Sequence, residues 1–180
     1  ADAAAALRAL ARWTGRPLPS DAEVLRLGAD VPVCLSGRPA RMTGIGEGLT
    51  PLPPLPALWV VLVNPRVAVP TPQVFAALTR RDNPPLPDLP PSALASAEAF
   101  TSWLTSHTRN DLVAPARSAA PLLTKVQSAL SATPACLLAR MSGSGGTHFG
   151  LFASAEAAET AARSLVSAHP GWWITAGKIS

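Results

Sequence analysis

The chain has 180 residues, of which 48% are hydrophobic and 14% charged, and its formal net charge is +4 at pH 7. This length allows one ordinary domain, or one domain with part of another. The longest uninterrupted apolar run, Ala57–Val63, has the length of a strand, well short of the roughly 18 residues of a membrane span. The positive charge comes from thirteen Arg and two Lys scattered along the chain, whereas nucleic-acid-binding proteins gather such residues with interleaved aromatics. We therefore expect neither a membrane nor a nucleic acid as a partner.

The cysteines and histidines lack the spacing of a metal or redox site. Cys34 and Cys136 lie far apart without a CxxC partner, and His107, His148 and His169 are equally isolated in the sequence. We expect no metal site on these residues and interpret the cysteines as buried thiols of a cytoplasmic protein. The first residues lack the pattern of a signal peptide and do not begin with Met, which indicates processing or a fragment.

The N-terminal part of the chain predicts short helices followed by a strand. Strong helix formers predict a helix over residues 2–13. A second, short helix is predicted to begin at Ser20, which can form a capping box with Glu23. Asp30 is then expected to cap the helical turn of "DVPVCL", where the helix dipole favours its ionised form. Residues 38–50, "RPARMTGIGEGLT", predict a strand that runs into a glycine turn.

After a proline-rich connector, the chain reads as strand, helices, two strands, helix and strand. The first strand is the apolar run at residues 58–65, and Thr71 is predicted to cap the next helix, with Pro72 at its first position. A long proline-rich loop, Asn83–Ser92, precedes three helical patterns. Two strands then flank a glycine turn, and Ser154 is expected to cap an amphipathic helix before the final strand. This order is that of a split βαβ, ferredoxin-like unit with extra helices in its first crossover, so we expect an α+β fold.

Two features could carry chemistry, although each also has a purely structural explanation. A carboxylate such as Asp30 at a helix N-terminus is most often a cap, but it could also accept or orient a hydroxyl proton in phosphoryl transfer. The glycine turn Ser142–Gly146 could direct backbone N–H groups at an anion, although such turns more often simply join strands.

Three further stretches leave the same choice open. In "TGIGE" a lone GxG is a weak indication of a ligand site, and Glu47 could be a surface residue. Thr71, Pro72 and Phe75 share one helical turn, where Phe75 could stack on a ligand or pack in the core. The proline string at residues 51–56 could be a PxxP ligand, but such strings are common in connectors.

Taken in order, "GADVPVCL", "GIGE" with "LTPLPPLP", "LVNPRVAVPTPQVF" and "MSGSGGTHFGLF" resemble one family. They are similar to the later part of the 4-diphosphocytidyl-2-C-methyl-D-erythritol kinases, which belong to the GHMP superfamily of small-molecule kinases. The resemblance runs from Ala1 to about Lys178. Homoserine and mevalonate kinases of the same superfamily share the final glycine motif more than the "GADVP" and "VPTP" stretches.

The resemblance implies a kinase that uses ATP and Mg²⁺ to phosphorylate the 2-hydroxyl of 4-diphosphocytidyl-2-C-methyl-D-erythritol in isoprenoid precursor synthesis. The family's catalytic base is matched by Asp30. Its cytidine-diphosphate substrate pocket is matched by Ile45, Gly46, Thr71, Pro72 and Phe75. The third superfamily motif, which supports the ATP phosphate loop, is matched by Gly143, Ser144, Gly145 and Gly146.

Two family features have no counterpart in the chain. The first helix resembles the one that follows the family's glycine-rich phosphate-binding loop, but that loop and the N-terminal lysine paired with the catalytic aspartate are not in the sequence. The resemblance thus implies that residues 1–56 end a GHMP ATP-binding domain and that residues 57–180 form the C-terminal domain. We expect the isolated chain to be inactive and its partner to be the missing N-terminal half of the same protein.

Two other functions stay open from the sequence. The chain could belong to another GHMP kinase with a different alcohol substrate. As an isolated polypeptide, it could also be a non-catalytic binding module that uses its proline segments or its C-terminal domain.

Overall fold

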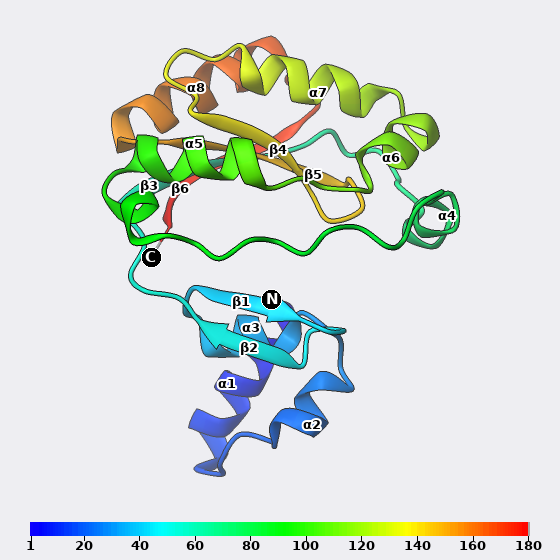
Figure 1. Ribbon diagram of the computed structural model, residues 1–180, viewed down its shortest axis with the longest axis vertical. Coiled ribbons are helices and arrows are strands. Elements are labelled where there is room, and N and C mark those ends of the chain that lie inside the picture. The colour runs from blue at the N-terminus through cyan, green and yellow to red at the C-terminus, as the bar shows by residue number, and fades with distance from the viewer. Residues whose placement is uncertain (180) are drawn as a thin grey trace. The chain divides into compact units, whose positions relative to one another are not determined.

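The computed structural model describes residues 1–179, which divide into two compact units, one up to Leu55 and one from Pro56 onward (Figure 1). Each unit has its own buried core. The first unit consists of short helices and a two-stranded antiparallel hairpin, in the order α1 (Asp2–Thr14), α2 (Asp21–Leu25), α3 (Val31–Ser36), β1 (Ala40–Thr43) and β2 (Gly48–Pro51).

The helices of the first unit pack around a small core. Ala4 of α1, Val24 of α2 and Val31 of α3 are buried together. The predicted capping box of α2 is confirmed, because the Glu23 carboxylate accepts hydrogen bonds from the backbone N–H and the hydroxyl of Ser20. The glycine turn continues into β2, which the sequence did not predict, since a four-residue strand beside a proline string shows no alternating pattern.

The second unit contains a longer series of elements. They are β3 (Leu58–Asn64), α4 (Thr71–Ala76), the 3₁₀ helix η1 (Pro91–Leu94), α5 (Ala97–His107), α6 (Val113–Ala119), α7 (Leu122–Ser131), β4 (Leu138–Ser142), β5 (Thr147–Phe152), α8 (Ala155–Ala168) and β6 (Trp173–Ile179). The Ser154 hydroxyl caps α8 as predicted. The predicted loop Asn83–Ser92 is irregular up to its last two residues, where η1 begins.

The strands of the second unit form one antiparallel sheet in the order β4-β5-β3-β6. Because β5 pairs with both β3 and β4, these two strands run parallel with β5 between them. The segment from β3 to β4 is therefore a split βαβ crossover, and the crossover from β5 through α8 to β6 encloses β3 in the same way. This topology confirms the predicted ferredoxin-like α+β fold.

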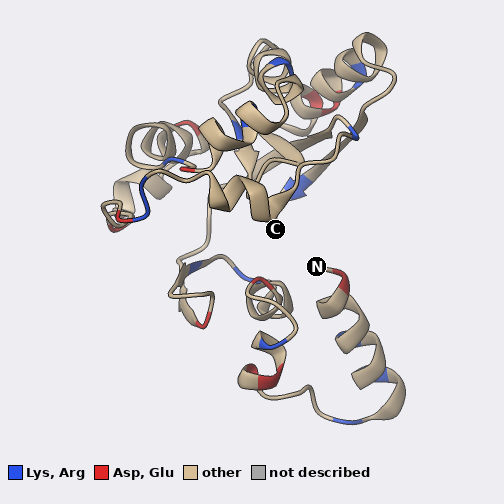
Figure 2. Ribbon diagram, turned by 90° about the vertical axis from the view of Figure 1, so that its right-hand side faces the viewer, with Lys and Arg blue, Asp and Glu red and all other residues tan. Residues whose placement is uncertain are grey.

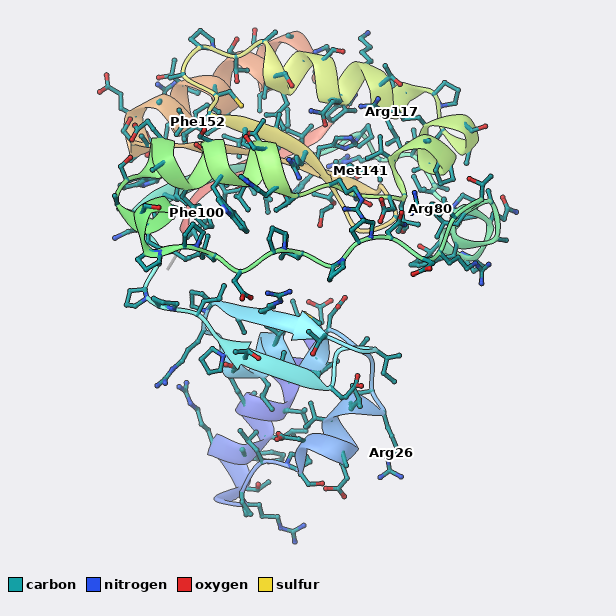
Figure 3. The ribbon with its side chains drawn as sticks, in the orientation of Figure 1. Arg26, Arg80, Phe100, Arg117, Met141 and Phe152 are labelled. Carbon is teal, nitrogen blue, oxygen red and sulfur yellow. The ribbon has the colours of Figure 1, made fainter. Side chains whose placement is uncertain are left out.

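Helices α7 and α8 cover one face of this sheet (Figure 1). The main core, which includes Phe152 at the end of β5 (Figure 3), consists of Val61, Val63, Val126, Leu130, Phe152, Ala158, Ala161 and Leu165. Removing such apolar side chains from water is the dominant favourable contribution to folding. From the opposite face of β4, Arg140 donates a 2.8 Å hydrogen bond to the Leu104 carbonyl of α5. Within residues 1–179, no helix combines the length and apolar character needed to cross a membrane.

The start of α4 differs from the prediction by one residue. Pro70 takes the N-cap position, Thr71 is the first helical residue and Pro72 the second. The Pro70 carbonyl accepts hydrogen bonds from the N–H groups of Gln73 and Val74, so the helix begins before a Thr71 side chain could cap it. The Thr71 hydroxyl is consequently available for another partner.

His148 of β5 is a fully buried polar residue on the helix-covered face of the sheet, where it pairs with Val63 and Met141. Among the described residues, neither of its ring nitrogens has a hydrogen-bond partner, and the buried Nε of Arg117 on α6 also lacks one. Burial, and to a lesser extent the nearby positive charge of Arg117, lower the pKa of His148 to about 4. The imidazole is therefore neutral in the folded protein at neutral pH.

This burial predicts a pH-dependent stability. The His148 pKa is about 4 in the folded state and ordinarily 6.5, so the unfolded chain binds a proton that the folded chain excludes. Stability should be complete above pH 6.5 and fall as the pH drops towards 4, by at most about 1.4 kcal/mol per pH unit. Urea denaturation at several pH values should show this slope, and His148→Leu should remove it. The matched control His107→Gln changes an exposed histidine of α5 and should retain it, whereas an equal slope in His148→Leu would contradict the assignment.

The turn between β4 and β5 is a second point of close packing. Gly143 and Gly145 both have positive φ angles, +53° and +119°. A Cβ on Gly145 would lie 3.0 Å from the Leu123 Cδ1 and Met141 Sδ atoms, whereas a Cβ on Gly143 would meet nothing within 4 Å. Residue 145 therefore combines a backbone angle that favours glycine with little space for a side chain.

These two glycines form a matched pair of substitutions. Gly145→Ala should lower the free energy of unfolding by about 3 kcal/mol, because it adds both backbone strain and overpacking. Gly143→Ala adds only the strain of a left-handed residue and should cost about 1 kcal/mol. Chemical denaturation of both variants tests the difference, and equal losses would show that packing against Leu123 and Met141 is unimportant.

Candidate functional site

In the first unit, the structure brings the "GADVP" and "GIGE" stretches together. Asp30 stands at the N-cap position of α3, as predicted, but its exposed carboxylate makes no capping hydrogen bond. Gly46 is buried with φ +109°, and a Cβ there would lie 2.4 Å from the Ala29 carbonyl oxygen. The turn that carries Gly46 therefore packs directly on the residue before Asp30, and this contact requires glycine.

Glu47 fixes the shape of the same turn. Its carboxylate folds back and accepts a 2.6 Å hydrogen bond from the Ile45 backbone N–H. The Ile45 side chain is 74% exposed, so this apolar group is presented to the surroundings of the first unit rather than to its core. The carboxylate that the sequence left as a possible surface residue is thus a structural element of the turn.

In the second unit, the "VPTP" helix and the glycine turn are joined by a hydrogen bond. The Thr71 hydroxyl lies 2.7 Å from the Ser144 hydroxyl, although the two residues are 73 positions apart. Val74 holds α4 in place, because it is fully buried in a cluster with Ala116, Leu123 and Met141. Pro72 is exposed, and Phe75 points away from this cluster with half of its surface accessible.

Asn110, which no pattern in the sequence singles out, supports the glycine turn. Its amide nitrogen donates hydrogen bonds to the carbonyls of Met141 and Gly143, at 3.1 and 2.9 Å. Its amide oxygen accepts the backbone N–H of Leu112 at 3.0 Å. An asparagine that precedes a helix is a common turn former, but the bonds to the distant turn leave no local signal in the sequence.

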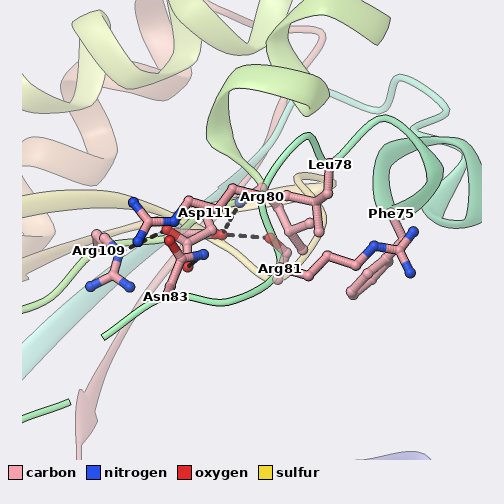
Figure 4. Close-up of a pocket in the computed structure, with 10 residues that line it drawn as sticks. Phe75, Leu78, Arg80, Arg81, Asn83, Arg109 and Asp111 are labelled. Carbon is pink, nitrogen blue, oxygen red and sulfur yellow. Dashed lines mark hydrogen bonds and ion pairs between the residues drawn. The ribbon is translucent and has the colours of Figure 1, made fainter. Parts of the chain in front are cut away.

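One open pocket of the second unit brings predicted residues from both stretches together (Figure 4). It has a volume of about 540 Å³ and is lined by Phe75, Leu78, Arg80, Arg81, Asn83, Arg109, Asn110, Asp111, Leu112 and Gly143. Phe75 and Gly143 were predicted site residues, whereas the arginines were not. The sequence showed the pair at residues 80–81 but gave no indication that Arg109 would join it.

On one side of this pocket, the polar side chains bond to one another. Arg109 Nε and an Asp111 carboxylate oxygen form a 2.8 Å ion pair. The Asn83 amide donates to the other Asp111 oxygen at 3.1 Å, and Arg109 also donates to the Pro84 carbonyl at 3.2 Å. Because both charged groups are partly exposed, the ion pair itself contributes little stability. The bonds from Asn83 to Asp111 and from Arg109 to Pro84 tie the proline-rich loop to the segment that precedes α6.

The remaining predicted residues belong to the glycine turn itself. Gly145 is buried beneath α6 and α7, and its N–H is used within the turn by a bond to the Ser142 carbonyl. Gly143 is exposed, with open space around its Cα. Gly146 lies next to the Asn64 amide. The accessible backbone of this turn is what could approach a phosphate group.

No group of three or more His, Cys, Asp or Glu side chains within residues 1–179 is arranged to hold a metal ion. Figure 2 shows Lys and Arg residues distributed over both units. Among the described pockets, the one that Phe75 lines has the most arginines, namely Arg80, Arg81 and Arg109.

Residues 92–170 match the family described as GHMP kinases C terminal. A 4-diphosphocytidyl-2-C-methyl-D-erythritol kinase of Cereibacter sphaeroides (strain ATCC 17029 / ATH 2.4.9) is 57% identical over 180 residues, which cover 99% of this chain and 64% of the relative. The kinase of the same name from Rhodospirillum rubrum is 50% identical, over 99% of this chain and 59% of the relative. The chain thus spans less than two thirds of the length of these relatives.

Solved structures agree with these matches. A crystal structure of 4-(cytidine 5'-diphospho)-2C-methyl-D-erythritol kinase matches with a TM-score of 0.76 and 34% identity, over 98% of this chain and 63% of that one. A homoserine kinase from Cytophaga hutchinsonii matches with a TM-score of 0.50 and 19% identity, over 73% of this chain and 45% of that one, which indicates a shared fold alone. The chain therefore contains a GHMP kinase C-terminal domain and is homologous to the part of the 4-diphosphocytidyl-2-C-methyl-D-erythritol kinases that includes it.

Proposed function

We propose that the protein is an ATP-dependent kinase that phosphorylates the 2-hydroxyl of 4-diphosphocytidyl-2-C-methyl-D-erythritol. The observation that carries this proposal is the meeting of the "VPTP" helix with the glycine turn. Thr71 bonds to Ser144, and Phe75 lines one pocket with Gly143. A half-exposed aromatic ring next to an accessible glycine backbone suits a ligand that has both a base and phosphates. The names of the curated relatives support the same substrate.

In this proposal, ATP supplies the phosphoryl group when it is bound. The Asp30 carboxylate accepts or orients the proton of the acceptor hydroxyl at one of its oxygens, which its exposure and lack of a capping bond allow. The glycine turn, with Gly143, Ser144, Gly145 and Gly146, lies beside the ATP phosphate loop in this proposal and helps to shape the nucleotide site. The substrate is held by Ile45, Gly46, Thr71, Pro72 and Phe75, with the cytidine end at Phe75.

The described residues do not form a dedicated magnesium cage, since no three acidic, His or Cys side chains converge. Mg²⁺ in kinases is commonly held by one or two carboxylates together with nucleotide phosphates. We therefore propose that Mg²⁺ would be held chiefly through the ATP phosphates. The proposal also includes an N-terminal part of the same protein as the source of the phosphate loop, and a cytoplasmic location.

The direct test is ATP-dependent phosphorylation by the full-length protein. Purified protein should convert 4-diphosphocytidyl-2-C-methyl-D-erythritol to its 2-phosphate, detected by mass spectrometry. Homoserine and mevalonate, offered under the same conditions, should give no product. Turnover of either of these alcohols without turnover of the cytidine compound would reject the proposed substrate.

The role of Asp30 predicts a specific kinetic change. Asp30→Asn keeps the shape of the side chain but removes its proton acceptor, so kcat should fall about 100-fold or more, while KM for the cytidine substrate stays within about threefold because uniform binding is not removed. Steady-state kinetics of the full-length protein measure both. Asp2→Asn, which changes another exposed aspartate in a first helical turn, serves as the matched control. Near-normal turnover in Asp30→Asn would exclude Asp30 as the base.

A further inference from the structure

Asn110 bonds directly to the glycine turn, but neither the comparisons nor the proposed function assigns it a role in the reaction. Both ends of its half-buried side-chain amide are in use. The nitrogen donates to the carbonyls of Met141 and Gly143, and the oxygen accepts the Leu112 N–H at the start of α6. One side chain therefore joins the beginning of a helix to a turn that lies more than thirty residues further along the chain.

The bond to the Gly143 carbonyl fixes the direction of the peptide group that joins Gly143 to Ser144. This peptide is trans, since none of the described residues has a cis peptide bond. In a planar trans peptide, the N–H and the C=O point in opposite directions. Because Asn110 holds the Gly143 carbonyl, the Ser144 N–H must lie on the side of the turn that faces away from Asn110.

Little else restrains this peptide group. Gly143 has a φ of +53° and open space around its Cα, and glycine can adopt many other backbone angles. The next N–H, that of Gly145, is used inside the turn by the Ser142 carbonyl. Within residues 1–179, by contrast, no carbonyl or side chain accepts the Ser144 N–H. Asn110 thus supplies a restraint on the Gly143–Ser144 peptide that the turn itself lacks.

We propose that Asn110 is a positioning residue for the nucleotide. By holding the Gly143 carbonyl, it keeps the glycine turn in the one form that shapes the ATP site. A turn held in this form can present the Ser144 N–H to an acceptor outside itself, a phosphate oxygen included. The inference rests on the proposed function in one respect, which is the place of the glycine turn beside the ATP phosphate loop.

Asn110→Asp tests the donor end of the amide alone. The aspartate keeps an oxygen that can accept the Leu112 N–H, but its second oxygen replaces the donor and faces two carbonyls. In the full-length protein, KM for ATP should rise about 10-fold, as expected when two hydrogen bonds that hold the turn are lost. KM for the cytidine substrate should stay within about twofold. Calorimetry should show the same 10-fold loss, roughly, in the affinity for a non-hydrolysable ATP analogue.

Gln127→Glu is the matched control. Its side-chain nitrogen donates a 2.7 Å hydrogen bond to the Ala139 carbonyl of β4, so the same amide-to-carboxylate change disturbs the same strand outside the glycine turn. It should leave KM for ATP at the parent value. Urea denaturation of both variants measures the free energy of unfolding separately from nucleotide affinity. If Asn110→Asp does not fold, Asn110→Ala removes the donor without placing an oxygen against the carbonyls, and it should also weaken binding of the ATP analogue.

Three results would overturn the role of Asn110. The first is an unchanged KM for ATP in the folded Asn110→Asp protein. The second is a rise in KM for the cytidine substrate that equals or exceeds the rise for ATP, because Asn110 would then act on the pocket beside Phe75. The third is an equal rise in Gln127→Glu, which would assign the effect to a general loss of hydrogen bonds to β4.

The calorimetry separates this inference from the proposed kinase activity. Weaker binding of the ATP analogue by Asn110→Asp would support the positioning role even if the full-length protein fails to phosphorylate the cytidine compound. Phosphorylation of that compound with the same KM for ATP in parent and variant would support the kinase and reject the positioning role. A parent protein that does not bind the ATP analogue would reject it as well.

Discussion

The pairing of β5 with both β3 and β4 is the constraint on which the second unit depends. It brings a strand at residues 58–64 next to strands that begin more than seventy residues later. The end of β5 that follows the glycine turn is further fixed by a 3.2 Å hydrogen bond from the Asn64 amide to the Thr147 hydroxyl. Once this register is set, Ser144 can reach Thr71, and the loops at this edge of the sheet converge.

Two asparagine side chains hold the loops at this edge of the sheet in defined positions. Asn64 accepts the backbone N–H of Arg66, which adopts a positive φ of 59° immediately after β3. Asn110 bonds to the glycine turn on one side and to the start of α6 on the other. Each side chain thus replaces hydrogen bonds that a regular strand or helix would otherwise supply, which is how irregular loops become precise enough to hold a ligand.

The overall fold could be predicted because its signals are local. Helix formers, the capping box at Ser20 and the alternation of strands with amphipathic helices gave the α+β class and the ferredoxin-like order. The start of α4 could not be predicted to the residue: the sequence favours Thr71 as the cap, but Pro70 holds that position. The strand β2 was missed for a similar reason, because it begins within a glycine turn and ends at a proline.

Only some of the residues that form the pocket could be predicted from the sequence. Phe75 and the glycine turn stood out through composition and through resemblance to a family, although their roles remain proposals. Asn110, Arg109 and the buried His148 carry no local pattern, because their importance comes from contacts with residues at least 25 positions away or from burial in the folded sheet. Such residues become visible only when the chain is folded.

The anchoring of α4 has a further consequence for how this site can change. Val74 is fully buried against Ala116, Leu123 and Met141, while its neighbour Phe75 stands in the pocket. Val74 is the one buried residue of this six-residue helix, so its packing and the bond from Thr71 to Ser144 set how α4 is oriented. Substitutions in the interior that change the volume around Val74 would therefore move the Phe75 ring. Evolutionary changes in the core and selection for a ligand would then affect the same residues.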